Sequence, residues 1–171
     1  MNKNVNLLAI SYVFGFTAAT ITVFLGAIIG SQITSIKSLS TLPVALSVVG
    51  TAICTILAAK IMSKIGRRLG FIFAALGSSA TALVATFAIY QQNFILFCIS
   101  NLILGMGMAF THQYRFAAAE SVEKEKAPKA ISILMLSGIV AAFLGITSSN
   151  YTKNLVSDHL YVGSYLLLAA F

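Results

Sequence analysis

One apolar run of the sequence carries polar side chains at a spacing that could serve chemistry. Asn101, Met108, His112 and Arg115 follow one another at separations of seven, four and three residues. On an α-helix, residues at these separations share a face. Polar groups are costly in hydrocarbon, so such a face normally points into a bundle interior or a water-filled cavity. We therefore predict that one stripe lines a pathway for a small solute; its members are Asn101, Gly105, Met108, His112, Arg115 and Ala119.

His112 is the member of this stripe that can change its charge near neutral pH. Next to Arg115 it could relay protons, or it could be a histidine held by hydrogen bonds at the edge of a membrane. The sequence leaves both interpretations open. No acidic side chain precedes Glu120, so proton movement would depend on His112 or on residues outside this chain.

The first apolar run adds hydroxyl groups at Tyr12, Thr17 and Thr20, which are candidates for lining the same pathway. Hydroxyl groups in membrane helices also bond to carbonyls of their own helix or join pairs of helices. The sequence favours this second interpretation over contact with a solute.

The remaining reactive side chains do not form the constellation of an enzyme or a metal site. Two histidines and two cysteines lack metal-ligand spacing, and the sequence has no phosphate-binding loop and no nucleophile with a base. Cys54 and Cys98 lie in different apolar runs, about 12 Å apart along the membrane normal, which is too far for a disulfide. We expect no catalysis, no metal and no cofactor.

The elements that must position these side chains are long apolar helices. Of 171 residues, 58% are hydrophobic and 9% are charged, whereas soluble domains average about 25% charged residues. A soluble fold could not cover so much apolar surface, but a lipid bilayer solvates it. One crossing needs about 20 apolar residues. The predicted helices cover residues 5–30, 42–62, 69–89, 94–115 with an extension to 120, 128–148 and 161–171.

Basic residues at the ends of these runs predict the orientation of the chain, because cytoplasmic loops are rich in Lys and Arg. With a cytoplasmic N-terminus, the cytoplasmic side holds Lys3, Lys64, Arg67, Arg68, Lys124, Lys126 and Lys129, and the other side holds Lys37 and Lys153. The net charge is +7. Its residues do not form an amphipathic or aromatic-interleaved face, which argues against nucleic acid as a partner.

The turn between the second and third runs carries a distinctive loop, residues 59–68 with the sequence AKIMSKIGRR. It resembles the loop signature of the major facilitator superfamily: a glycine, three residues, an aspartate, a basic residue, any residue, a glycine and two basic residues. Lys64, Gly66, Arg67 and Arg68 match this signature. Gly66 stands where we expect two helices to approach closely.

Two positions depart from the signature, with Ala59 in place of its glycine and Ser63 in place of its aspartate. In the family, that aspartate is thought to cap a neighbouring helix and to join a charge network that latches the cytoplasmic side. Ser63 can hydrogen-bond at a helix end but carries no charge, which puts such a latch in doubt. The competing interpretation is a basic turn that only anchors two helices at the cytoplasmic face.

The end of the fourth run, residues 113–120 with the sequence QYRFAAAE, also resembles bacterial members of the family. The resemblance implies that an arginine on this helix is tied to substrate or proton coupling. Arg115 is the nearest candidate, and its place near the cytoplasmic end predicts a gate role rather than a binding role. Glu120 is then the expected partner of Arg67 or Arg68. The glycine–proline pair typical of drug–proton antiporters is missing from the fifth run, which keeps only the glycines.

Together these features predict an all-α fold, a polytopic transmembrane bundle of about six helices over residues 1–171 without a soluble domain. The resemblance implies the N-terminal half of a secondary transporter that moves a small solute by alternating access. The last run is too short for a full crossing. We therefore expect that the native polypeptide continues or that its reading frame is interrupted.

The expected partners are the lipid bilayer, an unidentified small solute, and a C-terminal six-helix half or a second copy of the chain. The expected location is a bacterial inner membrane with the N-terminus in the cytoplasm. Two alternatives stay open. The chain could assemble with itself into a small carrier or channel, or it could be a membrane subunit or gene remnant that transports nothing.

Overall fold

The computed structural model describes residues 3–155 and 160–171, which form helices joined by short turns. The long helices are α1 (Lys3–Ile33), α2 (Leu42–Ile65), α3 (Arg67–Tyr90), α4 (Phe94–His112) and α6 (Ala127–Thr152). The short ones are α5 (Tyr114–Glu120), α7 (Val162–Ala170) and the 3₁₀ turns η1 (Lys37–Leu39) and η2 (Lys124–Lys126).

Five stretches of the described chain are long and apolar enough to cross a membrane. The fourth of them joins α4 and α5, and the others follow α1, α2, α3 and α6. In hydrocarbon every backbone N–H and C=O must be paired inside the protein, and a helix achieves this within one segment. The predicted all-α transmembrane bundle is therefore confirmed. Helix α7 has 9 residues, or about 14 Å of length against about 30 Å of hydrocarbon.

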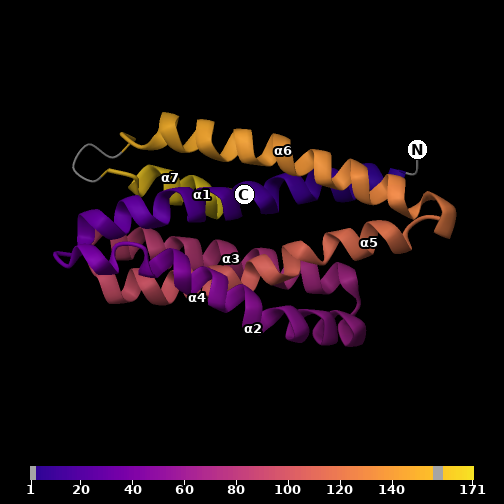
Figure 1. Cartoon of the computed structure of the whole chain (residues 1–171), viewed down its shortest axis with the longest axis horizontal. Coiled ribbons are helices and arrows are strands. Elements are labelled where there is room, and N and C mark those ends of the chain that lie inside the picture. Colours follow the sequence, from indigo (N-terminus) through magenta and orange to yellow (C-terminus); the bar gives the residue numbers. More distant parts are fainter. Residues whose placement is uncertain (1–2, 156–159) are drawn as a thin grey trace.

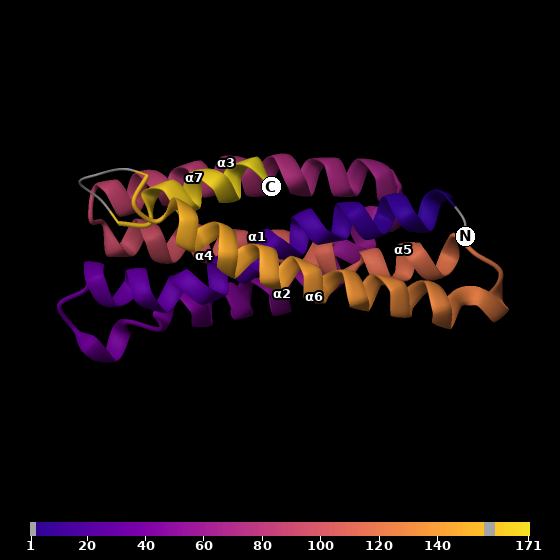
Figure 2. The same cartoon turned by 90° about the horizontal axis from the view of Figure 1, so that it is seen from above.

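The helices form three layers (Figures 1 and 2). Helices α3 and α7 lie side by side on one side of the bundle, α2 and α6 lie on the other, and α1, α4 and α5 run between them. Helix α2 packs mainly on α4, α1 packs mainly on α6, and α3 packs on both α4 and α7. The central layer is therefore covered from both sides.

The core of the bundle lies between the central layer and the layer of α3 and α7. Ile21 and Leu25 of α1 pack there with Phe97 of α4 and Tyr165 of α7. The outer faces carry large apolar side chains, and Phe143, for example, is 72% exposed. Soluble proteins rarely expose contiguous apolar surface of this extent. The exposed faces are therefore consistent with contact to lipid.

Glycines set the distance between α2 and α4. A Cβ on Gly50 would overlap the carbonyl oxygen of Leu102, and a Cβ on Gly105 would overlap that of Ser47. Across this close contact, the hydroxyl of Thr51 donates a hydrogen bond of 2.9 Å to the carbonyl oxygen of Gly105. Small residues allow membrane helices to approach closely in this way.

The fourth run is not one continuous helix, contrary to our expectation. It breaks at Gln113, whose N–H donates to the carbonyl oxygen of Phe110, three residues earlier, instead of to the one four residues earlier. Helix α5 then begins at Tyr114. Such a tight turn rotates the next residues of the chain relative to an ideal helix.

Gly66 is needed for a different reason from the one expected. A Cβ at this position would meet nothing within 4 Å, so close helix approach does not require glycine here. The backbone of Gly66 has φ +83°, a conformation that side chains with a Cβ rarely adopt. This conformation turns the chain from α2 directly into α3. At the start of α6, Pro128 lies in the first turn, as predicted.

Candidate functional site

The end of the bundle where α2 turns into α3 holds a paired charge; we call it the basic end, defined by Lys64, Arg67, Arg68 and Glu120. The turn at Gly66 makes Arg67 the first residue of α3, and Glu120 is the last residue of α5. Arg67 Nε donates to Glu120 Oε2 at 2.7 Å, and Arg67 Nη2 donates to Oε1 at 2.5 Å. This two-point contact ties α3 to α5.

The other residues of the loop motif make fewer contacts. Lys64 and Arg68 are exposed, and Glu120 pairs with Arg67 and not with Arg68. The hydroxyl of Ser63 donates to the carbonyl oxygen of Lys60, in its own helix, at 2.8 Å. Ser63 therefore does not cap a neighbouring helix. Ala59 is exposed on α2, and a role for this loop in gating stays a prediction.

Arg115 and His112 meet across the break between α4 and α5. Arg115 Nη2 lies 3.3 Å from His112 Nδ1. Both residues are half-buried. The Nε atom of Arg115 is buried, and no hydrogen-bond partner for it is found among residues 3–155 and 160–171. The three-residue spacing in the sequence correctly predicted that these two residues are neighbours. It did not indicate that Arg115 Nε lacks a hydrogen-bond partner in the described part of the chain.

The first residues of the predicted stripe, Asn101 and Gly105, are enclosed by neighbouring helices. Asn101 is fully buried; its Nδ2 donates to the carbonyl oxygen of Phe97 at 2.8 Å, and its Oδ1 accepts from the hydroxyl of Tyr165 at 3.5 Å. Gly105 packs on α2. Met108 faces a cavity between helices. Asn101, Gly105 and Met108 share one helix face but thus lie in three different surroundings. The position of this face on a transport pathway stays a prediction.

The hydroxyl groups of α1 bond mainly to their own helix. Thr17 donates to Val13 O at 2.7 Å and lies 3.3 Å from Ala141 O of α6, and Thr20 donates to Phe16 O at 3.0 Å. Tyr12 is buried and stacks on Phe16 with ring centroids 5.2 Å apart. These contacts match the interpretation that the hydroxyl groups bond to their own helix or join two helices. Contact of these residues with a solute stays a prediction.

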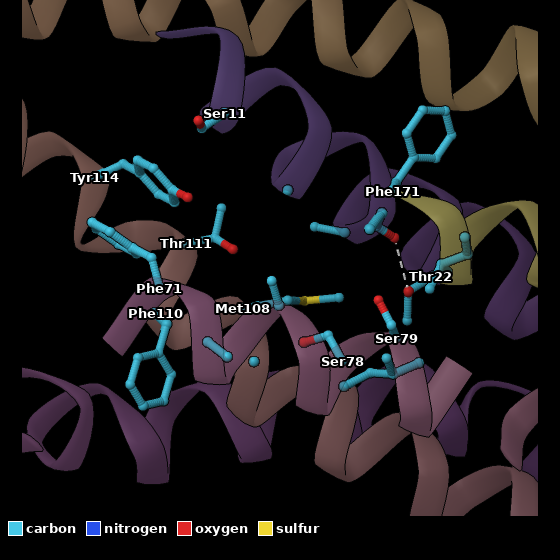
Figure 3. A pocket seen from close by; sticks show the side chains of 18 residues that line it. Ser11, Thr22, Phe71, Ser78, Ser79, Met108, Phe110, Thr111, Tyr114 and Phe171 are labelled. Carbon is cyan, nitrogen blue, oxygen red and sulfur yellow. Dashed lines mark hydrogen bonds between the residues drawn. The ribbon is translucent and has the colours of Figure 1, made fainter. Parts of the chain in front are cut away.

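A cavity of about 100 Å³ lies between α1, α3, α4 and α7 (Figure 3). Hydroxyl groups of Ser11, Ser78, Ser79 and Thr111 line it, and its walls include Met108, a predicted pathway residue. The four hydroxyl groups were not predicted from the sequence. The sequence feature that could have indicated hydroxyl groups in a cavity is the pair Ser78 and Ser79 in the middle of the third apolar run.

A wider groove of about 740 Å³ runs from this cavity toward the basic end, along α1 and α3. Phe71 and Tyr114 belong to both the cavity and the groove, and their rings stack with centroids 3.9 Å apart. The residues that line the cavity and the groove come from α1, α3, α4, α5 and α7 and from the residues just after α5 and α7, and none of them belongs to α2 or α6.

Among the described residues, no group of His, Cys, Asp and Glu side chains could hold a metal ion. Cys54 and Cys98 are buried and free.

The long apolar helices and the basic turn of residues 59–68 fit the resemblance to the major facilitator superfamily. The model of the Major Facilitator Superfamily matches residues 7–170. The chain belongs to this superfamily. Together with the five stretches that are long and apolar enough to cross a membrane, this match shows that the protein is an integral membrane protein.

The superfamily relatives are longer than this chain. The riboflavin transporter RfnT of Brucella anthropi is 32% identical over 164 residues, which are 96% of this chain and 41% of the relative. Two uncharacterized transporters of this superfamily from Bacillus subtilis, YdeG and YddS, are 30% and 25% identical, and the match covers 32% and 33% of their lengths. The chain thus spans less than half of the relatives it matches. No solved structure matches it significantly.

Proposed function

We infer that this chain is the first helix bundle of a secondary transporter that moves a small solute across a bacterial inner membrane by alternating access. The match of the superfamily model over residues 7–170 is the observation that supports this most strongly. The spanning stretches supply the membrane part that such a carrier needs.

Transport by this chain requires a second helix bundle. Carriers of this type place the solute near the middle of the membrane, between two repeats that move against each other. The chain matches 41% of the length of RfnT. A C-terminal bundle, or a second copy of this chain, would supply the opposite wall.

Riboflavin is the first solute to test, because RfnT is a riboflavin transporter and is 32% identical over the matched residues. A chimera separates this question from the need for a second bundle. In it, this chain replaces the matched part of RfnT, and riboflavin uptake is measured in cells that cannot make the vitamin.

Uptake through the chimera is the expected result. A chimera that reaches the membrane in normal amounts but moves neither riboflavin nor other solutes would refute the proposed function. Strong uptake by the chain alone, without any second bundle, would refute only the need for that bundle. Uptake measured with and without a pH gradient decides whether transport is coupled to protons, for which His112 is the candidate in this chain.

The basic end faces the cytoplasm, because it gathers the excess of Lys and Arg. There the pair of Arg67 and Glu120 holds α3 to α5 and forms part of a gate. The pair opens when the two helices separate. Because the loop carries Ser63 and not an aspartate, this pair takes the place of the usual latch.

A further inference from the structure

Four hydroxyl side chains on the wall of the cavity between α1, α3, α4 and α7 have no hydrogen-bond partner within residues 3–155 and 160–171. They are Ser11 of α1, Ser78 and Ser79 of α3, and Thr111 of α4. Thr22, on the same wall, shows the usual arrangement of a hydroxyl group in a membrane helix, because it donates to the carbonyl oxygen of Ala18 at 2.9 Å (Figure 3). The other four hydroxyl groups line the cavity without such a bond.

The size and the lining of the cavity suit water. A hydroxyl group without a partner is costly in hydrocarbon. Water removes this cost, since a buried water forms about three hydrogen bonds and a hydroxyl group can both donate and accept. The cavity has a volume of about 100 Å³, whereas one water molecule needs about 10–15 Å³. Several water molecules therefore find both space and partners there.

Two glycines leave room for these hydroxyl groups. A Cβ on Gly107 of α4 would overlap the hydroxyl oxygen of Ser78, and a Cβ on Gly15 of α1 would lie 3.3 Å from the hydroxyl oxygen of Thr111. Larger residues at these positions would push the hydroxyl groups away. The sequence therefore keeps polar groups in the middle of the bundle, since Ser79 lies near the midpoint of α3.

The cavity continues into the groove that runs to the basic end. The cavity and the groove share residues of α1, α3 and α5, namely Ser11, Phe71, Ala75 and Tyr114. The rings of Phe71 and Tyr114 stack with centroids 3.9 Å apart and lie together at one end of the cavity (Figure 3). Farther along, the groove is lined by Asn4, Arg67 and Arg68. Polar side chains thus lie at the basic end, at the junction and inside the cavity.

The opposite end of the cavity is closed by the core of the bundle. Leu104 and Leu168 line the cavity and also belong to the core cluster that contains Ile21, Phe97 and Tyr165. All five side chains are buried. Water can therefore enter the cavity from the basic end but not from the other end of the bundle.

We propose that the cavity and the groove form a water-filled inlet, which reaches from the basic end to the middle of the membrane and has its neck at Phe71 and Tyr114. The ligand of the inlet is water, held by the hydroxyl groups of Ser11, Ser78, Ser79 and Thr111. The neck admits small polar molecules and excludes bulky ones. The inlet requires a membrane around the bundle, but it does not depend on which solute is transported.

Engineered cysteines test the inlet, because a cysteine reacts with methanethiosulfonates as a thiolate, which forms in water and not in hydrocarbon. Cys54 and Cys98 are first replaced by alanine in the whole chain. Inside-out and right-side-out membrane vesicles are then prepared from cells that carry one further change: Ser11→Cys, Ser79→Cys or Thr111→Cys. The probe is sulfonatoethyl methanethiosulfonate, which is small, charged and unable to cross the membrane.

Ala80→Cys is the matched control, because Ala80 follows Ser79 at nearly the same depth but is exposed on α3 and lines neither the cavity nor the groove. Lys64→Cys marks the side of the basic end, since Lys64 is exposed there. Ser79→Cys and Thr111→Cys should react at least about tenfold faster than Ala80→Cys. They should do so only from the side on which Lys64→Cys reacts.

Two results would overturn the inlet. Equal rates for Ser79→Cys, Thr111→Cys and Ala80→Cys would mean that lipid tails and not water fill the groove. Reaction of Ser11→Cys alone, or reaction from the side opposite to Lys64→Cys, would mean that water does not pass the neck. Ser79 and Thr111 belong to different helices, so the test still decides if one of these variants does not fold.

The neck is tested with fluorescein maleimide, a bulky thiol reagent. It should label Lys64→Cys but not Ser79→Cys. Adding Phe71→Ala to Ser79→Cys should allow labelling, whereas Phe73→Ala should not, because Phe73 is 63% exposed on α3 and lines neither the cavity nor the groove. Equal labelling of Ser79→Cys with and without Phe71→Ala would refute the neck.

Discussion

The substitution Gly105→Ala should separate α2 from α4. A Cβ at Gly105 would overlap the carbonyl oxygen of Ser47 and lie 2.8 Å from Ser47 Cα. Both are backbone atoms, so no rotation of a side chain can relieve the clash. Overpacking costs about 1–3 kcal/mol. Separation also removes the hydrogen bond from Thr51 to Gly105, worth about 0.6 kcal/mol in membrane proteins. The expected loss of stability is about 2–4 kcal/mol.

The assay is reversible unfolding in mixed micelles, with increasing fractions of dodecyl sulfate and detection of helix content by circular dichroism. Gly77→Ala is the matched control, because Gly77 is exposed on α3 and a Cβ there would meet nothing within 4 Å. It should be neutral or slightly stabilising, since alanine favours a helix over glycine by about 1 kcal/mol. If Gly105→Ala is as stable as Gly77→Ala, the close crossing of α2 and α4 is refuted.

Three further predictions concern the basic end, the core and the topology. Glu120→Gln should lower the free energy of unfolding by less than about 1 kcal/mol, because its pair with Arg67 is partly exposed. Glu125→Gln is the control, and a loss of several kcal/mol at Glu120 would contradict this. Tyr165→Phe should cost little, because the 3.5 Å bond to Asn101 is long, whereas Tyr165→Ala should cost about 3–5 kcal/mol in the same assay. A similar loss for both would show that the hydroxyl group matters most. Reporter tags in the α2–α3 turn and in the α3–α4 turn should appear on opposite sides of the membrane; tags on one side would disprove that α3 crosses it.

The positions of the helices could be predicted from the sequence because a membrane sets their length. Each run of about 20 apolar residues must be a helix, since lipid cannot pair with the backbone. The structure reproduces these runs closely, including the position of Pro128 in the first turn of α6. The contact of His112 with Arg115 also follows from helical spacing, because residues three apart are neighbours.

The neighbours of each helix face could not be predicted in this way. In a soluble protein a polar face marks the outside of a helix, but lipid and protein interior are equally apolar. The stripe around Asn101 therefore gave no sign that Asn101 meets Tyr165 or that Gly105 meets α2. The cavity between α1, α3, α4 and α7 depends on the same packing, and its serines were overlooked.

The sequence by itself thus determined the membrane environment, the helical segments and the basic turn, since these depend on local composition and length. Only the tertiary structure decided that Glu120 pairs with Arg67, that Gly66 serves a backbone turn, and that Arg115 keeps an unpaired nitrogen. These features depend on how helices distant in sequence are placed against one another. Lipid solvates apolar helix surfaces as well as protein does, so small residues and polar atoms at the contacts decide the arrangement of the helices.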